Sequence, residues 1–243
     1  MTENRPNALY KYRTVNENGL RIISHNEVFY ASPSMFNDPY ELEFNVSIKQ
    51  KPNSTANRVA IESLRPKIEA NIKGAFHKTI GFLSLSALNN QILMWSHYSN
   101  KHTGFCVGIN PSALTFENLK PITYSKHLYS VKCQLDEKEE GVKVPIENDQ
   151  YLIGICNTKY DCWKYEEEWR DVKRVSGIAT LPQDAVQEVV LGLKTSDTDN
   201  ALIIDALILR RQNFPSASPV KLMQAQASTD KYELEIIDTG RTY

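Results

Sequence analysis

Three short segments combine large aromatic side chains with groups that ionise or donate hydrogen bonds: residues 36–41 (Phe-Asn-Asp-Pro-Tyr-Glu), 94–98 (Met-Trp-Ser-His-Tyr) and 163–170 (Trp-Lys-Tyr-Glu-Glu-Glu-Trp-Arg). A chain that needed only a core would use Leu, Ile and Val at this density. Aromatic walls around a few polar groups are typical of a pocket for a planar ligand. Because the segments lie far apart in sequence, a single site made from them requires a folded domain.

The main catalytic candidates are two acids in the third segment, Glu166 and Glu168. In an extended stretch these carboxylates lie on one face, while Glu167 lies on the other. Neighbouring carboxylates repel, so one can keep a raised pKa while the other stays ionised. That division suits sugar transfer, in which one acid holds a hydroxyl and the other stabilises a positively charged transition state. The alternatives are a solvated acidic face, or a helix in which Glu166 pairs with Arg170.

Residues 94–98 permit two interpretations. On a short helix, Met94, Trp95 and Tyr98 form a buried stripe, and His97 is an ordinary satisfied histidine. Alternatively, His97 and Tyr98 line a pocket, with Tyr98 stacked on an aromatic ligand.

Two other segments contain ligand-binding candidates. Asn37 and Asp38 precede a proline, so they belong to a structured loop that is either a self-bonded turn or a pocket wall. The Lys11 and Arg13 side chains alternate with Tyr12 on an expected strand. They are either solvated, or one of them points into a carboxylate-lined pocket and binds a pyrophosphate.

Hydroxyl groups complete the candidate set. Ser84 and Ser86 share one face of an expected strand, where they could hold a ribose or an amide. The chain has no Gly-rich phosphate loop, no Gly-x-Ser-x-Gly elbow and no His-Glu-x-x-His helix. The sequence therefore gives little support to a nucleophilic serine or a zinc hydrolase.

The composition limits the classes of partner. The 243 residues are 41% hydrophobic, with 28 Lys and Arg against 29 Asp and Glu and a net charge of -1, so no global basic field for nucleic acid exists. No apolar run approaches the roughly 20 residues that span a bilayer. The first residues lack the apolar segment of a secretory signal. We expect a cytoplasmic protein that does not enter a membrane.

Four cysteines, Cys106, Cys133, Cys156 and Cys162, fit a reducing compartment as free thiols. Cys156 and Cys162 do not have the close spacing of a zinc knuckle, and no histidine stands beside them. We expect buried structural cysteines and no metal.

Hydrophobic periodicity predicts one α+β domain over residues 1–243, because strands and helices are interspersed and no long linker divides them. A proline at position 66 is expected to kink or divide the helix in which it lies. The expected helices are 16–25, 54–78, 89–98, 148–164 and 198–211. The expected strands are 8–13, 28–31, 41–46, 79–86, 103–109, 121–125, 128–134, 169–175, 186–193, 220–227 and 232–237.

Several of these motifs resemble a bacterial family catalogued only as a domain of unknown function, number twenty-nine seventy-one. The matching pieces are residues 9–13, 36–41, 93–98 with 104–106, 163–170 and 189–192. The Asn-Asp-Pro and Trp-x-x-Tyr pieces are fairly specific.

The order of parts is also similar to that of ADP-ribosyltransferases. Those enzymes place a basic residue on the first strand, hydroxyl or aromatic residues on a middle strand, and a Glu-x-Glu on a later strand. The resemblance implies a split mixed β-sheet, flanked by helices, that grips NAD as co-substrate in its cleft. It maps Glu168 and Glu166 onto the catalytic acids. It maps the basic residue onto Lys11 or Arg13, and the hydroxyl and aromatic residues onto Ser84 with Ser86 and onto Tyr98. The expected NAD-binding set is completed by other residues of the same segments: Tyr12, Asn37, Asp38, Trp95 and His97. The chain departs from the pattern in having no Ser-Thr-Ser.

This resemblance implies an NAD-dependent ADP-ribosyltransferase, as a toxin or phage-defence effector that modifies RNA, DNA or protein. An antitoxin or chaperone partner follows from the same kinship. Two alternatives come from other classes. A non-catalytic nucleotide-binding module would keep the aromatic pocket and tolerate the loss of Glu168, whereas a protein-interaction module of a defence system would need neither.

Overall fold

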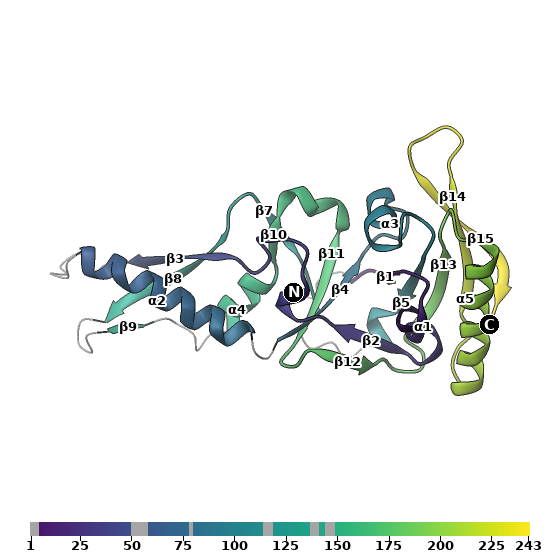
Figure 1. Cartoon of the computed structure of the whole chain (residues 1–243), viewed down its shortest axis with the longest axis horizontal. Coiled ribbons are helices and arrows are strands. Elements are labelled where there is room, and N and C mark those ends of the chain that lie inside the picture. Colours follow the sequence, from purple (N-terminus) through teal and green to yellow (C-terminus); the bar gives the residue numbers. More distant parts are fainter. Residues whose placement is uncertain (1–4, 50–57, 78–79, 114–118, 137–140, 144–148) are drawn as a thin grey trace.

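The computed structural model describes residues 5–49, 58–77, 80–113, 119–136, 141–143 and 149–243. An eight-stranded mixed sheet forms the centre of an elongated molecule (Figure 1). Its strand order is β15 (Leu234–Thr242), β14 (Lys221–Ala227), β13 (Val186–Leu191), β5 (Phe105–Ile109), β1 (Leu9–Arg13), β4 (Gly81–Ser86), β11 (Glu168–Lys173) and β6 (Lys120–Pro121). Within this sheet, among the described residues, only β13 and β14 run parallel. The predicted α+β class, with a mixed sheet and flanking helices, is confirmed.

Smaller sheets extend this centre. At one end, on the left in Figure 1, β3 (Phe44–Lys49), β8 (Tyr129–Asp136) and β9 (Gly141–Lys143) form a three-stranded sheet beside α2 (Arg58–His77). Two short pairs complete the sheets: β2 (Glu27–Tyr30) with β12 (Gly177–Thr180), and β7 (Thr123–Ser125) with β10 (Thr158–Tyr160). The remaining elements are α4 (Asp149–Cys156) and the 3₁₀ turns η1 (Pro33–Met35), η2 (Pro111–Ala113) and η3 (Asp161–Glu166).

Helices cover both faces of the central sheet. The helices α1 (Glu17–Ser24) and α5 (Asp197–Asn213) bury Ile22 and Leu207 on one face, in a core that includes Leu83 and Val107. The short helix α3 (Ile92–Tyr98) covers the other face. Asn16 and Ser196 cap α1 and α5 by accepting hydrogen bonds from first-turn backbone amides, as N-cap residues do.

The central sheet opens between β1 and β4. All five residues of β1 pair with β5, from Leu9 opposite Ile109 to Arg13 opposite Phe105. The pairing of β1 with β4 is limited to Tyr10 opposite Ser86. Since β4 in turn pairs along its whole length with β11, β4 and β11 separate together from β1. This opening positions the site described below.

Several elements differ from the sequence expectations. The helix expected over 148–164 ends at Cys156, and the chain continues as β10 and η3. The helix α2 continues through the exposed proline at position 66, so this proline does not divide it, and the expected kink stays a prediction. The strands β9 and β12 were not expected. Cys162 is exposed, whereas the other three cysteines are buried, and all four are free.

Within the part of the chain that the structure describes, no helix combines the length and apolar character needed to cross a membrane.

Candidate functional site

A cavity of about 290 Å³ lies at the opening of the sheet. Its walls come from β1, β4, the loop around residues 31–41, α3, η3 and β11. Three of the segments singled out by the sequence therefore meet in one place. Of the twelve residues expected in the site, ten line the cavity: Lys11, Tyr12, Arg13, Asn37, Asp38, Ser84, Ser86, Tyr98, Glu166 and Glu168.

The acid pair is brought together by a turn rather than by an extended strand. Glu166 ends η3, Glu167 adopts a left-handed conformation with φ of 40°, and Glu168 begins β11. The expectation of strand alternation is therefore wrong for this stretch. The left-handed residue nevertheless leaves Glu167 exposed and turns both neighbours inward, where Glu166 and Glu168 are 3% and 4% exposed.

A buried lysine joins the two acids. The Nζ atom of Lys159, on β10, lies 2.6 Å from Glu166 Oε2 and 2.9 Å from Glu168 Oε2. The carboxylate of Glu41 lies 3.9 Å from the same nitrogen. The Lys159 side chain is only 8% exposed, so water screens these contacts weakly.

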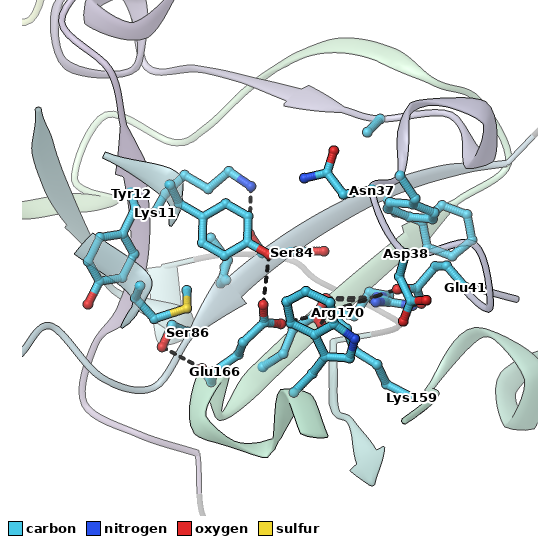
Figure 2. Close-up of a pocket in the computed structure, with 18 of the residues that line it drawn as sticks. Lys11, Tyr12, Asn37, Asp38, Glu41, Ser84, Ser86, Lys159, Glu166 and Arg170 are labelled. Atoms are coloured by element: carbon cyan, nitrogen blue, oxygen red, sulfur yellow. Dashed lines mark hydrogen bonds and ion pairs between the residues drawn. The ribbon is translucent and has the colours of Figure 1, made fainter. Parts of the chain in front are cut away.

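An arginine holds the far side of the same network. Arg170 donates from Nε and Nη2 to Glu168 Oε1, at 3.0 and 2.8 Å. Its Nη1 donates to Glu41 Oε1 at 2.8 Å and to the Cys156 carbonyl at 2.6 Å. Three carboxylates thus face two cations, an excess of one negative charge when all five groups are ionised. Figure 2 shows Glu41, Arg170, Lys159 and Glu166 along one side of the cavity.

The two acids titrate in opposite directions. Burial alone would raise the pKa of Glu168, but the charges of Arg170 and Lys159 outweigh it and lower the pKa to about 2. Burial raises the pKa of Glu166, and Lys159 opposes that shift only in part. Glu168 is therefore ionised throughout the physiological range, while Glu166 is the acid better suited to exchange a proton.

The α3 residues divide between site and core. The Tyr98 hydroxyl donates to Glu166 Oε1 at 2.7 Å, so this tyrosine belongs to the site. Trp95 is fully buried, donates from its indole nitrogen to the Asn89 carbonyl at 2.8 Å, and packs edge-on against Tyr12. His97 is exposed. Trp95 and His97 do not line the cavity, because α3 turns those two positions toward the core and toward solvent.

The cations of β1 differ in their engagement. Lys11 Nζ donates to the Ser84 carbonyl at 2.7 Å across the opening, and burial together with the charge of Arg13 lowers its pKa to about 7. Arg13 also lines the cavity, and its buried Nε has no hydrogen-bond partner among the described residues. Of the described cations that line the cavity, Arg13 is therefore the best placed to meet an anionic ligand.

Most of the remaining polar candidates already form hydrogen bonds within the protein. The Ser86 hydroxyl donates to the Glu166 carbonyl at 2.6 Å and accepts from the Leu88 amide at 3.0 Å. The Tyr12 hydroxyl donates to the Leu88 carbonyl at 2.7 Å. Asp38 Oδ1 accepts from the Tyr40 amide at 2.8 Å, which is the self-bonded turn that the sequence allowed. Asn37 lines the cavity, and Figure 2 shows its side chain directed into it.

The lining residues missing from the sequence-based set include four that bring charge or a large aromatic ring to the acid network: Glu41, Lys159, Trp163 and Arg170. Three of them lie inside the three aromatic segments, so their presence there was a usable signal. Lys159 had no such signal, because residues 148–164 were expected to be helical. It lies 5.2 Å from the centre of the Trp163 ring, a cation–π contact that encloses its charge.

Residues 94–170 match the model of a family described as "Protein of unknown function (DUF2971)". The matched segment contains Tyr98, Lys159 and the acid pair with Arg170, but neither β1 nor the loop of residues 36–41. The resemblance to this family is confirmed for that segment. No curated protein and no solved structure matches the chain. Among the described residues, no group of histidine, cysteine and acidic side chains could hold a metal.

Proposed function

We propose that this protein is an NAD-dependent ADP-ribosyltransferase. The observation that carries the proposal is the arrangement at the opening of the sheet: an acidic network on β11 and η3 and two cations on β1 line the same cavity. NAD has matching chemistry. Its pyrophosphate is anionic, and its nicotinamide-bearing ribose becomes positively charged as nicotinamide leaves.

The proposed reaction breaks the bond between ribose C1′ and the nicotinamide nitrogen, whose electron pair leaves with nicotinamide. An acceptor atom then bonds C1′ and loses its proton. Glu168, ionised with a pKa of about 2, holds the ribose and stabilises the oxocarbenium-like transition state. Glu166, with its raised pKa, positions the acceptor and takes its proton. The excess negative charge of the network favours a cationic sugar at this point.

At the other end of the ligand, Arg13 meets the pyrophosphate. Its planar guanidinium can bond two phosphate oxygens at once, and its Nε has no partner among the described side chains. Lys11 contributes charge but remains bound to the Ser84 carbonyl. Tyr98 and Trp163 supply aromatic surface for nicotinamide.

The cavity volume limits how much of NAD is enclosed. A volume of about 290 Å³ lies just below the range for ligand pockets, roughly 300–1,000 Å³. It suits one nucleoside half, so the adenosine half extends toward the rim. Phe29 and Met35 lie at that rim and are 39% and 58% exposed, which provides apolar surface for a second base.

A second candidate function is a non-catalytic nucleotide-binding module. One observation favours it: every carboxylate oxygen of Glu166 and Glu168 already accepts a hydrogen bond from Tyr98, Lys159 or Arg170. A module of this kind would bind NAD without consuming it. The acid network would then serve stability alone.

Replacing each acid in turn separates the two functions. Glu168→Gln should lower turnover by about 10²–10³-fold, because the amide keeps the shape and loses the charge that the transition state needs. Glu166→Gln should give an intermediate loss, and the exposed Glu167→Gln is the matched control with near-normal turnover. The assay combines labelled NAD with a mixed pool of RNA, DNA and protein.

NAD binding by calorimetry and thermal melting are measured for each variant as well. They are needed because Glu168→Gln removes a charge that Arg170 and Lys159 both contact, which can change stability as well as catalysis. NAD binding retained with turnover lost supports the enzyme. Binding without any turnover in the unaltered protein supports the nucleotide-binding module. Equal turnover in all three variants would exclude a catalytic role for the acids.

A further inference from the structure

Lys159 occupies an unusual position for a lysine. It lies on the three-residue strand β10, which pairs in parallel with β7. Its ammonium group reaches carboxylates from three separate segments: the loop before β3, η3 and β11. A lysine side chain is seldom buried unless it is paired, and here three acids pair with one nitrogen.

The pairing is unequal among the three acids. Glu41 and Glu168 both also contact Arg170, at 2.8 Å. Glu166 contacts no cation other than Lys159 among the described residues; the other hydrogen bond to its carboxylate comes from the Tyr98 hydroxyl. Without Lys159, two buried carboxylates would therefore face each other, and one of them would have no counter-charge.

We propose that Lys159 is a positioning residue whose single ammonium group holds Glu166 and Glu168 side by side and keeps Glu166 ionised at neutral pH. The catalytic meaning of this role rests on the proposed function, whereas the electrostatic role does not. Through these contacts Lys159 sets the pH range over which the acid pair is active.

The other charged and titratable groups around the cluster do not replace it. Arg170 faces Glu41 and Glu168 from β11. From α3 and β7, Tyr98 and Tyr124 contribute hydroxyl groups: Tyr98 donates to the Glu166 carboxylate, and Tyr124 accepts from the Glu168 amide. Lys11 and Arg13, on β1, are not within salt-bridge distance of Glu166 in the described structure.

The test compares Lys159→Met and Lys159→Arg with the control Lys73→Met, which removes a half-exposed lysine paired with Glu43 at 2.7 Å, away from the cavity. In Lys159→Met, the acidic limb of the kcat/KM profile for NAD should move up by at least about one pH unit, a tenfold loss at pH values on that limb. Lys159→Arg keeps a positive charge at this position, so its acidic limb should lie close to that of the unaltered protein. Lys73→Met should leave the acidic limb unchanged.

Melting temperature against pH gives a readout that needs no turnover. A carboxyl group whose pKa is raised by folding is destabilising once pH exceeds its unfolded value of about 4.3. Relative to the unaltered protein, Lys159→Met should therefore lose stability progressively as pH rises from about 4 through 7. The double variant Lys159→Met/Glu166→Gln, which removes the unpaired acid as well, should recover most of that loss.

These outcomes separate the two proposals. Absence of NAD turnover in the unaltered protein would reject the proposed function, while the melting series would still test Lys159. Identical pH profiles for Lys159→Met and the unaltered protein, in melting or in kcat/KM, would overturn the role of Lys159. If Lys159→Met fails to fold, failure of the double variant to fold would do the same.

Discussion

At the scale of single residues, the cavity separates charges that cancel in the composition. The chain carries a net charge of -1, which indicates no preferred partner. Folding collects an acidic network around Glu168 and leaves Arg13 with a buried Nε that lacks a partner among the described residues. A buried donor without a partner costs free energy, and a ligand anion would recover that cost.

Replacing Arg13 tests this assignment directly. Arg13→Met should weaken binding of NAD and of ADP-ribose by about 10–100-fold, because a charge-assisted hydrogen bond contributes about 1.5–3 kcal/mol. Binding of free nicotinamide, which has no phosphate, should not change. Calorimetry provides the measurement, with the exposed Arg174→Met as control. Equal NAD affinity in the two variants would show that Arg13 does not contact the pyrophosphate.

Some residues of the site could be predicted from the sequence and others could not. Glu166 and Glu168 were identified from their residue types and spacing, although the turn at Glu167 replaces the strand that was expected to align them. Lys159 was missed because its importance comes from three carboxylates supplied by other segments. A single lysine in an unremarkable stretch has no local pattern that would reveal such contacts.

At the scale of elements, the presence of a strand was easier to predict from the sequence than its pairing with other strands. The alternation in residues 8–13 and 79–86 correctly indicated the strands β1 and β4. That these strands pair only at Tyr10 and Ser86 depends on contacts made elsewhere in the sheet. A split sheet was expected only from the resemblance to ADP-ribosyltransferases, because hydrophobic periodicity indicates strands but not how they pair.

The helix α3 shows how one short element serves both core and site. Trp95 is fully buried and Tyr98 reaches Glu166, while His97 faces solvent. Trp95→Ala should destabilise the protein by about 3–5 kcal/mol, the usual cost of removing a buried aromatic side chain. His97→Ala, its exposed neighbour, should change both stability and NAD affinity little. Urea unfolding measures the stability of each variant, and calorimetry measures its NAD affinity. A strong loss of NAD affinity in His97→Ala would show that His97 contributes to the binding site.

At the scale of the whole molecule, the cavity lies between segments that are distant in sequence and that belong to different sheets. The loop of residues 36–41 leads into the small sheet of β3, β8 and β9 at one end (Figure 1). β1 belongs to the central sheet, which continues to β14 and β15. The α+β class and single domain could be inferred from the interspersed elements. The elongated arrangement could not, since it depends on how four separate sheets pack.

A ligand that contacts both parts should stabilise the molecule as a whole. At 100 times its dissociation constant, NAD should add about 2.7 kcal/mol to the free energy of unfolding. For a domain of this size, about 1 kcal/mol raises the melting temperature by roughly 2–4 °C, so the expected increase is roughly 5–10 °C. ADP-ribose should reproduce much of the shift, because it retains the pyrophosphate that Arg13 is proposed to bind.

Nicotinamide at the same concentration as NAD should give a much smaller shift, because it contacts only the aromatic wall beside Tyr98. Thermal melting in the three ligands, with the Arg13→Met variant alongside, measures each part of this expectation. In that variant the NAD and ADP-ribose shifts should fall toward the nicotinamide value. No shift with millimolar NAD in the unaltered protein would argue that the cavity at the opening of the sheet binds something other than a dinucleotide.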